Sequence, residues 1–238
     1  MIRACRRAGV QLGTGFHLRH HPLHQEARRL VLAGELGAVR AAEAEWSTAP
    51  RRPAEATLAR AMGEGYSSPW RSEPALAFAG ITTGTGIHAL DLLRYVLDDE
   101  LTAITAFTDA TTSPIAPLET AAVALLRFRH GTLATLRCVR GIPRPQNDLA
   151  LLGATARLAV RHSLDEVTRG MVEAEGIDTD VFGVPSGADM YTLEAEAFMR
   201  AVQASEEPNA SGEDGLRVVE ALDALLESAR TGRTVSLE

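Results

Sequence analysis

Apolar side chains recur at every second position through the middle of the chain, a pattern typical of half-buried β-strands. Two turn sequences, Arg129-His130-Gly131-Thr132 and Gly153-Ala154-Thr155, separate neighbouring runs, and strands joined by such short turns must be antiparallel. A further strand or loop is expected to run through about residue 184. The strands predicted in this way span residues 9–16, 39–46, 101–108, 120–129, 132–140, 148–153, 156–161 and 234–237.

Other segments repeat apolar residues every three or four positions, which predicts amphipathic helices, and residues 1–8 look like the tail of another helix. Pro22 suits a first helical turn, Ser211 suits an N-cap, and Gly232 follows the last helix. The predicted helices span residues 22–33, 87–97, 188–204 and 213–231. Because helices and strands are segregated, we expect an α+β fold: an open, largely antiparallel mixed sheet with helices packed on one face.

The segment 48–80 shows no period and holds four prolines and three glycines, so we expect a long irregular excursion. One helical turn is expected at Ala54–Met62. Near the end of the segment, Trp70 and Arg71 suit a contact with a ligand or a neighbouring subunit. A tryptophan that packs the loop onto the core is an equally good interpretation.

Composition excludes several classes of function. The net charge is −7, which argues against nucleic acid as a general partner. All 24 basic residues are arginine, so lysine-based acid/base or Schiff-base chemistry is excluded within this chain. Cys5 and Cys138 form neither a disulfide framework nor a metal cluster, and we expect reduced thiols. There is no secretory signal and no apolar run of about 18 residues, so we expect a cytoplasmic protein without membrane association.

The stretch Gly80–Leu97 is the first place to look for a reactive centre, because flexible small residues lead to His88 at the start of a helix. Within it, Gly84–Ala89 fits G-x-G-x-x-A, a variant of the dinucleotide fingerprint. However, the preceding Glu73–Thr83 is a poor strand, and hairpins rather than βαβ units follow. We therefore interpret the match as accidental.

Four histidines, His17, His20, His21 and His24, lie within eight residues. A metal site needs converging ligands, and Pro22 should turn these side chains in different directions. We favour polar groups at the end of a strand, some facing a cleft, and predict no metal site. A Ser-His-Asp triad is not indicated, since no serine lies in a G-x-S-x-G elbow.

Motifs in order along the chain resemble the Gfo/Idh/MocA family of NAD(P)-dependent oxidoreductases of sugars and cyclitols. Gly9–Pro22 fits G-V-x-L-x-x-G-F-x-x-R-x-x-P, and Leu32–Val39 fits L-x-G-E-L-G-x-V. The remaining matches are Trp70-Arg71, Gly86–Leu93, Tyr191 with Phe198, and the ending from Ser211-Gly212-Glu213-Asp214-Gly215 to Thr231-Gly232-Arg233.

The resemblance implies a C-terminal α+β domain whose open sheet serves substrate binding and oligomer contacts. It covers residues 17–238, while residues 1–16 would be a remnant helix and strand of a missing nucleotide-binding domain. The E-K-P segment with the family's catalytic lysine would lie upstream. The family's aspartate four residues before the histidine is replaced by Gly84. Asp91 is expected to anchor the helix.

The resemblance carries the catalytic role to His88 alone. The candidate substrate-binding residues are His17, Arg19, His20, Trp70, Arg71 and Tyr191. No cofactor is expected in this chain, and NAD(P) would enter only with a partner domain. We also expect a small, polar, sugar-like substrate, a Rossmann-domain partner protein, and a homo-oligomer formed through the sheet face.

Four hypotheses stay open at this point. The first is a stand-alone or split substrate-binding domain that cannot transfer hydride by itself. The second is a cofactor-free isomerase, lyase or cyclase with His88 as general acid/base, a role that suits the histidine pKa. The third is a non-catalytic oligomerisation or binding module, and the fourth is a truncated reading frame.

Overall fold

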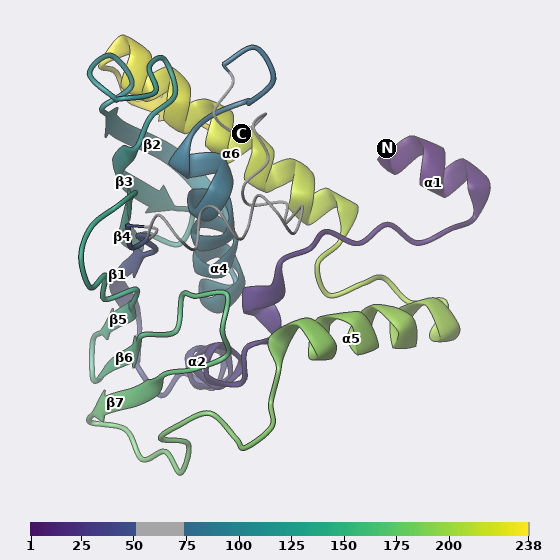
Figure 1. Cartoon of the computed structure of the whole chain (residues 1–238). Coiled ribbons are helices and arrows are strands. Elements are labelled where there is room, and N and C mark those ends of the chain that lie inside the picture. Colours follow the sequence, from purple (N-terminus) through teal and green to yellow (C-terminus); the bar gives the residue numbers. More distant parts are fainter. Residues whose placement is uncertain (51–73, 238) are drawn as a thin grey trace.

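The computed structural model describes residues 1–50 and 74–237, which fold around a single eight-stranded sheet (Figure 1). The strands are β1 (Val39–Glu45), β2 (Leu101–Thr108), β3 (Ala121–Phe128), β4 (Leu133–Val139), β5 (Leu149–Gly153), β6 (Arg157–Arg161), β7 (Met171–Glu175) and β8 (Val235–Ser236). The helical elements are α1 (Ile2–Ala8), η1 (His17–His20), α2 (Pro22–Leu32), η4 (Thr82–Gly86), α4 (Ile87–Leu97), α5 (Met190–Ala204) and α6 (Gly212–Thr231).

The strand order is β7-β6-β5-β1-β4-β3-β2-β8, and only β1 and β4 pair in parallel. In Figure 1 the helices lie on one side of the sheet. There α6 packs on β2, α4 on β1 and α2 on β6, so the core lies between sheet and helices. The α+β fold with a largely antiparallel mixed sheet is confirmed.

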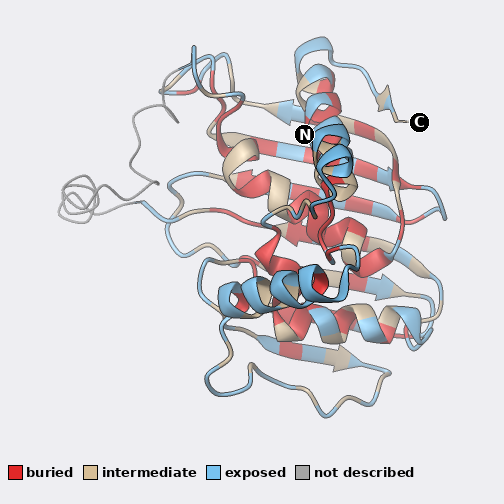
Figure 2. Cartoon of the chain, turned by 90° about the vertical axis from the view of Figure 1, so that its right-hand side faces the viewer, coloured by how far each residue is buried: buried red, intermediate tan, exposed pale blue. Residues whose placement is uncertain are grey.

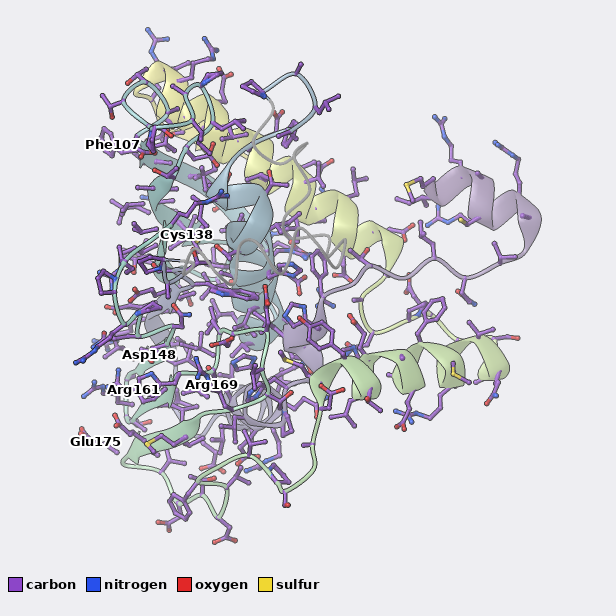
Figure 3. All side chains as sticks on the ribbon, viewed as in Figure 1. Phe107, Cys138, Asp148, Arg161, Arg169 and Glu175 are labelled. Atoms are coloured by element: carbon purple, nitrogen blue, oxygen red, sulfur yellow. The ribbon has the colours of Figure 1, made fainter. Side chains whose placement is uncertain are left out.

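The other face of the sheet is bare in the described chain and carries large apolar side chains. Phe107 is 72% exposed and projects to the side away from the helices, whereas Cys138 is fully buried on the helix side (Figure 3). In β3, exposed and buried residues alternate along the strand. The exposed apolar residues of this outer face, which we call the open face, are Phe107, Val123, Leu125, Leu133 and Leu152.

The strand predicted at residues 9–16 is wrong. The segment makes an isolated bridge between Gly13 and Ser211, and Thr14 donates from its amide to Ala210 O and from its hydroxyl to Ser211 O. No edge of the main sheet is beside it to supply a ladder. It leads instead from η1 out to α1, which buries none of its residues and stands apart from the core (Figure 1).

The expectation that His88 lies at a free helix start also needs correction. The helix continues backwards through the π-helical turn η4, and the amide of Ile87 donates to the carbonyl of Thr82. Gly84 and Gly86 are therefore part of a helix and do not form a phosphate-binding loop. The tightness of the preceding turn requires glycine, because a Cβ at Gly80 would lie 1.9 Å from the carbonyl oxygen of Glu119.

The first C-terminal helix begins two residues later than the predicted residue 188, and the second begins at the predicted cap, Ser211. Asp189 caps α5, and Ser211 caps α6 in a full capping box with Asp214. The helical turn predicted at Ala54–Met62 lies outside the described residues. Across the described part of the chain, no helix is long and apolar enough to cross a membrane.

Candidate functional site

Five rings meet beyond the end of β1, between η1, α4 and α5. The imidazole of His17 stacks on Tyr191 with centroids 4.7 Å apart and lies 4.8 Å from His88. Trp46 lies 5.7 Å from His17 and 5.6 Å from His88, and Phe16 meets His88 edge-on at 6.0 Å. We call these five residues the ring cluster. It brings together two of the histidines and the tyrosine that the sequence selected.

Hydrogen bonds from distant segments fix the α4 side of the ring cluster. The buried carboxylate of Glu119 accepts from the amide and the hydroxyl of Thr82, at 3.0 and 2.6 Å, which holds the start of η4. One turn on, the hydroxyl of Thr85 donates to the carbonyl oxygen of Trp46 at 2.9 Å. These bonds tie the helix that carries His88 to the strand end that carries Trp46.

An ion pair fixes the side of the ring cluster that η1 forms. The guanidinium of Arg19 binds both oxygens of Asp91, at 2.8 and 2.6 Å, and also pairs with Asp214 at 3.0 Å. Burial raises the pKa of Asp91 to about 6, and the positive charge of Arg19 opposes this shift. Because Arg19 follows His17 by two residues and Asp91 follows His88 by three, the pair sets the spacing of the two imidazoles.

His17 is held neutral near pH 7. Burial lowers its pKa to about 4, and the nearby His20 and His21 act in the same direction, while the backbone of Asp165 opposes them. Its side-chain nitrogen Nε2 is buried and has no hydrogen-bond partner among the described residues. A neutral imidazole with an open nitrogen can accept a hydrogen bond from, or donate one to, a hydroxyl group.

Thr83, Gly84, Ile87 and His88 share one partly exposed face of the helix. A Cβ at Gly84 would meet nothing within 4 Å, so the face is open at the position where the resemblance implies an aspartate. The hydroxyl of Thr83 is buried and has no hydrogen-bond partner in the described chain. The face therefore offers a ligand an imidazole and a hydroxyl beside an open space.

Helix α5 forms the opposite wall. Tyr191 is 43% exposed, and burial of the phenol with the charge of Glu166 raises its pKa. Glu194 follows three residues later, and burial raises the pKa of its carboxyl group to about 7. Its oxygen Oε1 has no hydrogen-bond partner among the residues described.

The expectation that Pro22 turns the N-terminal histidines in different directions is wrong for one pair, because the rings of His21 and His24 lie side by side with centroids 4.5 Å apart. His21 binds the carbonyl of Arg169, His24 binds the hydroxyl of Ser163, and His20 is buried as the last residue of η1. Burial lowers the pKa of all three. Within residues 1–50 and 74–237, no three His, Cys, Asp or Glu side chains are placed to hold a metal ion.

The sequence selected some members of the site and missed others. Trp70 and Arg71 lie outside the described residues. Trp46 was interpreted only as a strand end, although the alternation of β1 already put it on the buried face with Ala42 and Ala44. Glu194 was also missed, although its spacing of three from Tyr191 on a predicted helix placed both on one face.

A separate polar cavity of about 280 Å³ lies on the far side of Arg19. Its charged groups are joined to each other: Arg94 binds Glu100 at 2.6 Å, and Arg28 binds Asp98 at 2.8 Å. Acidic groups outnumber the arginines there, and each arginine is already paired. This cavity therefore offers no ready site for an anion. It is lined by Arg19, Arg28, Arg94, Tyr95, Asp98, Asp99, Glu100, Asn209 and Asp214.

Comparison with protein families matches residues 24–159 to the GFO/IDH/MocA C-terminal domain. The chain is 25% identical over 242 residues to a 1,5-anhydro-D-fructose reductase of Ensifer adhaerens, covering 100% of this chain and 68% of that protein. It is 29% identical over 245 residues to a D-xylose 1-dehydrogenase (NADP(+)) of Haloferax volcanii, covering 98% of this chain and 67% of that protein.

Among solved structures, the chain resembles the aldose-aldose oxidoreductase of Caulobacter crescentus complexed with glycerol, with a TM-score of 0.81 and 23% identity. That alignment covers 99% of this chain and 67% of the other. At this level of identity the likeness shows the fold. The chain spans about two thirds of the length of each of these three proteins.

Proposed function

Since this chain belongs to the GFO/IDH/MocA family, we propose that it forms the substrate-binding unit of an NAD(P)-dependent oxidoreductase that acts on a sugar or cyclitol. The observation that carries the proposal is the ring cluster. Relatives named for sugar dehydrogenation or reduction support the substrate class. None of the three proteins named above is an isomerase, lyase or cyclase, so the cofactor-free alternatives gain no support.

The ring cluster suits a sugar for two reasons. Its aromatic faces, Trp46 and Tyr191, can pack on the C–H face of a sugar ring, as aromatic side chains do with apolar surfaces generally. Its imidazoles, His17 and His88, can exchange hydrogen bonds with hydroxyl groups. In this arrangement His88 is the group that moves a proton at the reacting hydroxyl, and His17, held neutral, orients the sugar.

The glycine pattern at Gly84–Ala89 does not fit a phosphate-binding loop for a dinucleotide. The one glycine pattern that imitates a phosphate-binding loop is helical at Gly84 and Gly86, and the amide of Ile87 is bonded within the helix. The chain also has no lysine to take the role that the family gives that residue. We therefore propose that hydride transfer uses a nucleotide-binding unit, in the same polypeptide or as a separate protein. That unit would bring NAD(P), the source or acceptor of the hydride.

A surface for such a unit lies on the helix side. Figure 2 looks onto this side and shows exposed residues on α1 and α5 in front of the sheet. Exposed apolar side chains there are unusual for a surface that stays in water. They are Val10, Phe198, Met199, Val202, Leu216 and Val219, which we call the helix-side patch. We propose that the nucleotide-binding unit packs on it.

The open face is the proposed contact between copies of this chain. Its apolar residues follow neighbouring strands across the sheet, so they form one continuous surface. At the edge of these residues Arg137 and Glu45 form an ion pair. An apolar centre with a polar margin is the usual composition of a homo-oligomeric interface.

Two titrations test the proposal. The first measures NADH and NADPH binding by the 238-residue chain alone, where we expect none at micromolar concentration. The second adds a nucleotide-binding unit, such as the part of the Ensifer adhaerens reductase that this chain does not cover, and follows sugar-dependent reduction of NAD(P)+. We expect activity only in the mixture or fusion, and none with His88→Ala. Tight NAD(P)H binding by the chain alone would refute the proposed division of labour.

A further inference from the structure

Glu194 faces the segment that carries His17, because α5 contacts this segment on both sides of it. Three residues before Glu194, the ring of Tyr191 stacks on His17. Four residues after it, the ring of Phe198 lies so close to Gly13 that a Cβ there would be 2.8 Å away. Residues three and four apart lie on the same face of a helix. The carboxyl group of Glu194 is therefore directed at residues 13–17.

One oxygen of this carboxyl group has no hydrogen-bond partner among the described residues. Oε1 of Glu194 is buried without a hydrogen-bond partner among the described residues, and so is Nε2 of His17, a residue only 4% exposed. A buried polar group without a partner destabilises the fold, because it has lost its hydrogen bonds to water. Two such groups on facing elements indicate a place where a ligand completes the hydrogen bonds.

Other carboxylates near the ring cluster are already engaged. Asp91 is bound to Arg19, and Asp165 binds Arg169. Gly84, beside His88, contributes no side chain at all. Among the described residues, Glu194 thus contributes the one buried carboxyl oxygen without a hydrogen-bond partner, whereas Glu166, which also acts on Tyr191, is exposed.

The surroundings favour the protonated acid. From η1, His17 and His20 face this side of α5, and both have lowered pKa values, so neither supplies a positive charge near pH 7. The cation of α5 on this side, Arg200, acts on His20 and pairs with Glu196. From the loop after β6, Glu166 acts electrostatically on Tyr191 of the same helix face, as Glu194 does. A protonated carboxyl group donates one hydrogen bond and accepts others.

We propose that Glu194 and His17 form a hydrogen-bonding subsite for one hydroxyl group of a neutral polyol, with Glu194 as donor and Nε2 of His17 as its companion. This rests on the proposed function, which supplies the substrate class. A hydroxyl group matches the pair because it both donates and accepts. Glu194 lies on α5, the wall opposite His88, and His17 lies in η1 beside His88. The pair would therefore orient the sugar rather than react with it.

Three variants test the assignment: Glu194→Leu removes the polar group, Glu194→Gln keeps a donor of the same shape, and Glu196→Gln is the control. Glu196 is two residues away, half exposed, and pairs with Arg200. The first readout is thermal unfolding of the free chain at pH 8. We expect Glu194→Leu to unfold at the same or a higher temperature than wild type, since it removes an unpartnered buried acid. A marked decrease would show that the fold itself uses this carboxyl group, and would overturn the proposal.

The second readout is calorimetric titration with myo-inositol and D-xylose at pH 6.5. We expect affinity about 10-fold lower for Glu194→Leu, the loss of one hydrogen bond to a ligand, and within about 3-fold of wild type for Glu194→Gln and Glu196→Gln. Wild-type affinity in Glu194→Leu would overturn the subsite. If the wild-type chain itself binds neither polyol, the proposed function fails instead, and the unfolding measurement still decides whether the fold uses Glu194.

Discussion

Arg19 and Asp91 form a bidentate ion pair whose side chains are 5% and 1% exposed, and it joins the two elements that carry the imidazoles of the ring cluster. The sequence selected Arg19 as a substrate-binding residue. In the structure its guanidinium binds Asp91, Asp214 and the carbonyl of Asn209. We therefore interpret Arg19 as a residue that positions His17 against His88.

Removing one partner of the Arg19–Asp91 pair should strongly reduce the stability of the fold. Asp91→Asn leaves Arg19 buried beside a neutral group, and breaking a buried ion pair in this way costs about 3–5 kcal/mol of unfolding free energy. The exposed pair between Arg230 and Glu227 is the control, and Glu227→Gln should change the unfolding free energy little. Urea denaturation measures both. Equal, small effects would contradict the role assigned to Arg19 and Asp91.

Acid should destabilise the fold through its buried histidines. Burial lowers the pKa of His17 from 6.5 to about 4 and the pKa of His24 well below 6.5, so the unfolded chain binds more protons than the folded one in this range. The contribution of these neutral histidines to the free energy of unfolding is therefore fully present above about pH 6.5, and it is lost as the pH falls toward 4. At pH 4 the protonation of His17 should lower the free energy of unfolding by on the order of 3 kcal/mol.

Denaturation at half-unit steps from pH 7.5 to 4 measures this loss, with His17→Asn as the variant. The slope between pH 6.5 and 4 should be smaller in His17→Asn than in wild type. His130→Asn is the control, because that side chain is 75% exposed. A slope that is the same in wild type and His17→Asn would contradict the buried, neutral state of His17.

The sheet could be predicted from sequence because its alternation is regular. In β3 each buried residue is followed by an exposed one, so the pattern alone located the strand to within one residue at each end. The helix start before His88 could not be predicted, since Thr82–Gly86 has low helical propensity. Its conformation depends on Glu119, which lies more than 30 residues away in sequence. The strand predicted at residues 9–16 was wrong because a local alternation of apolar and polar residues forms a strand only beside another strand. Within the described chain, the fold places no strand of the main sheet next to this segment.

The site was only partly visible in the sequence for a similar reason. His88 and Tyr191 could be selected from motifs. However, no local pattern indicates that η1, β1, α4 and α5 meet at one point. Trp46 belongs to the ring cluster through its contacts with His17 and His88, and these contacts exist only in the folded chain.

Alanine substitutions at two glycines near the site should change the stability of the protein in opposite directions. Gly84 is helical and has open space around its Cβ position, so Gly84→Ala should stabilise the protein by about 0.5–1 kcal/mol. Gly80→Ala would place a Cβ 1.9 Å from the carbonyl oxygen of Glu119 and should destabilise it. Thermal unfolding of the two variants should therefore shift in opposite directions, and a decrease for Gly84→Ala would contradict the open space beside His88.

Two charged substitutions should distinguish the two exposed apolar surfaces. Leu125 is 61% exposed on the open face, and Leu216 is 48% exposed on the helix-side patch. Leu125→Glu should reduce the particle mass in light scattering and leave the affinity for a nucleotide-binding unit intact. Leu216→Glu should leave the particle mass unchanged and reduce the affinity for a nucleotide-binding unit. A monomeric wild-type chain, or identical behaviour of the two variants, would contradict these assignments.

The most direct test of the account is whether a polyol binds at the ring cluster. The chain has seven histidines, and ¹⁵N NMR of their side chains can follow them during titration with D-xylose or myo-inositol. We predict saturable shifts of His17 and His88 together, with no change at the exposed His130 and His162. Saturable binding that leaves both His17 and His88 unshifted would place the substrate elsewhere and contradict the central claim.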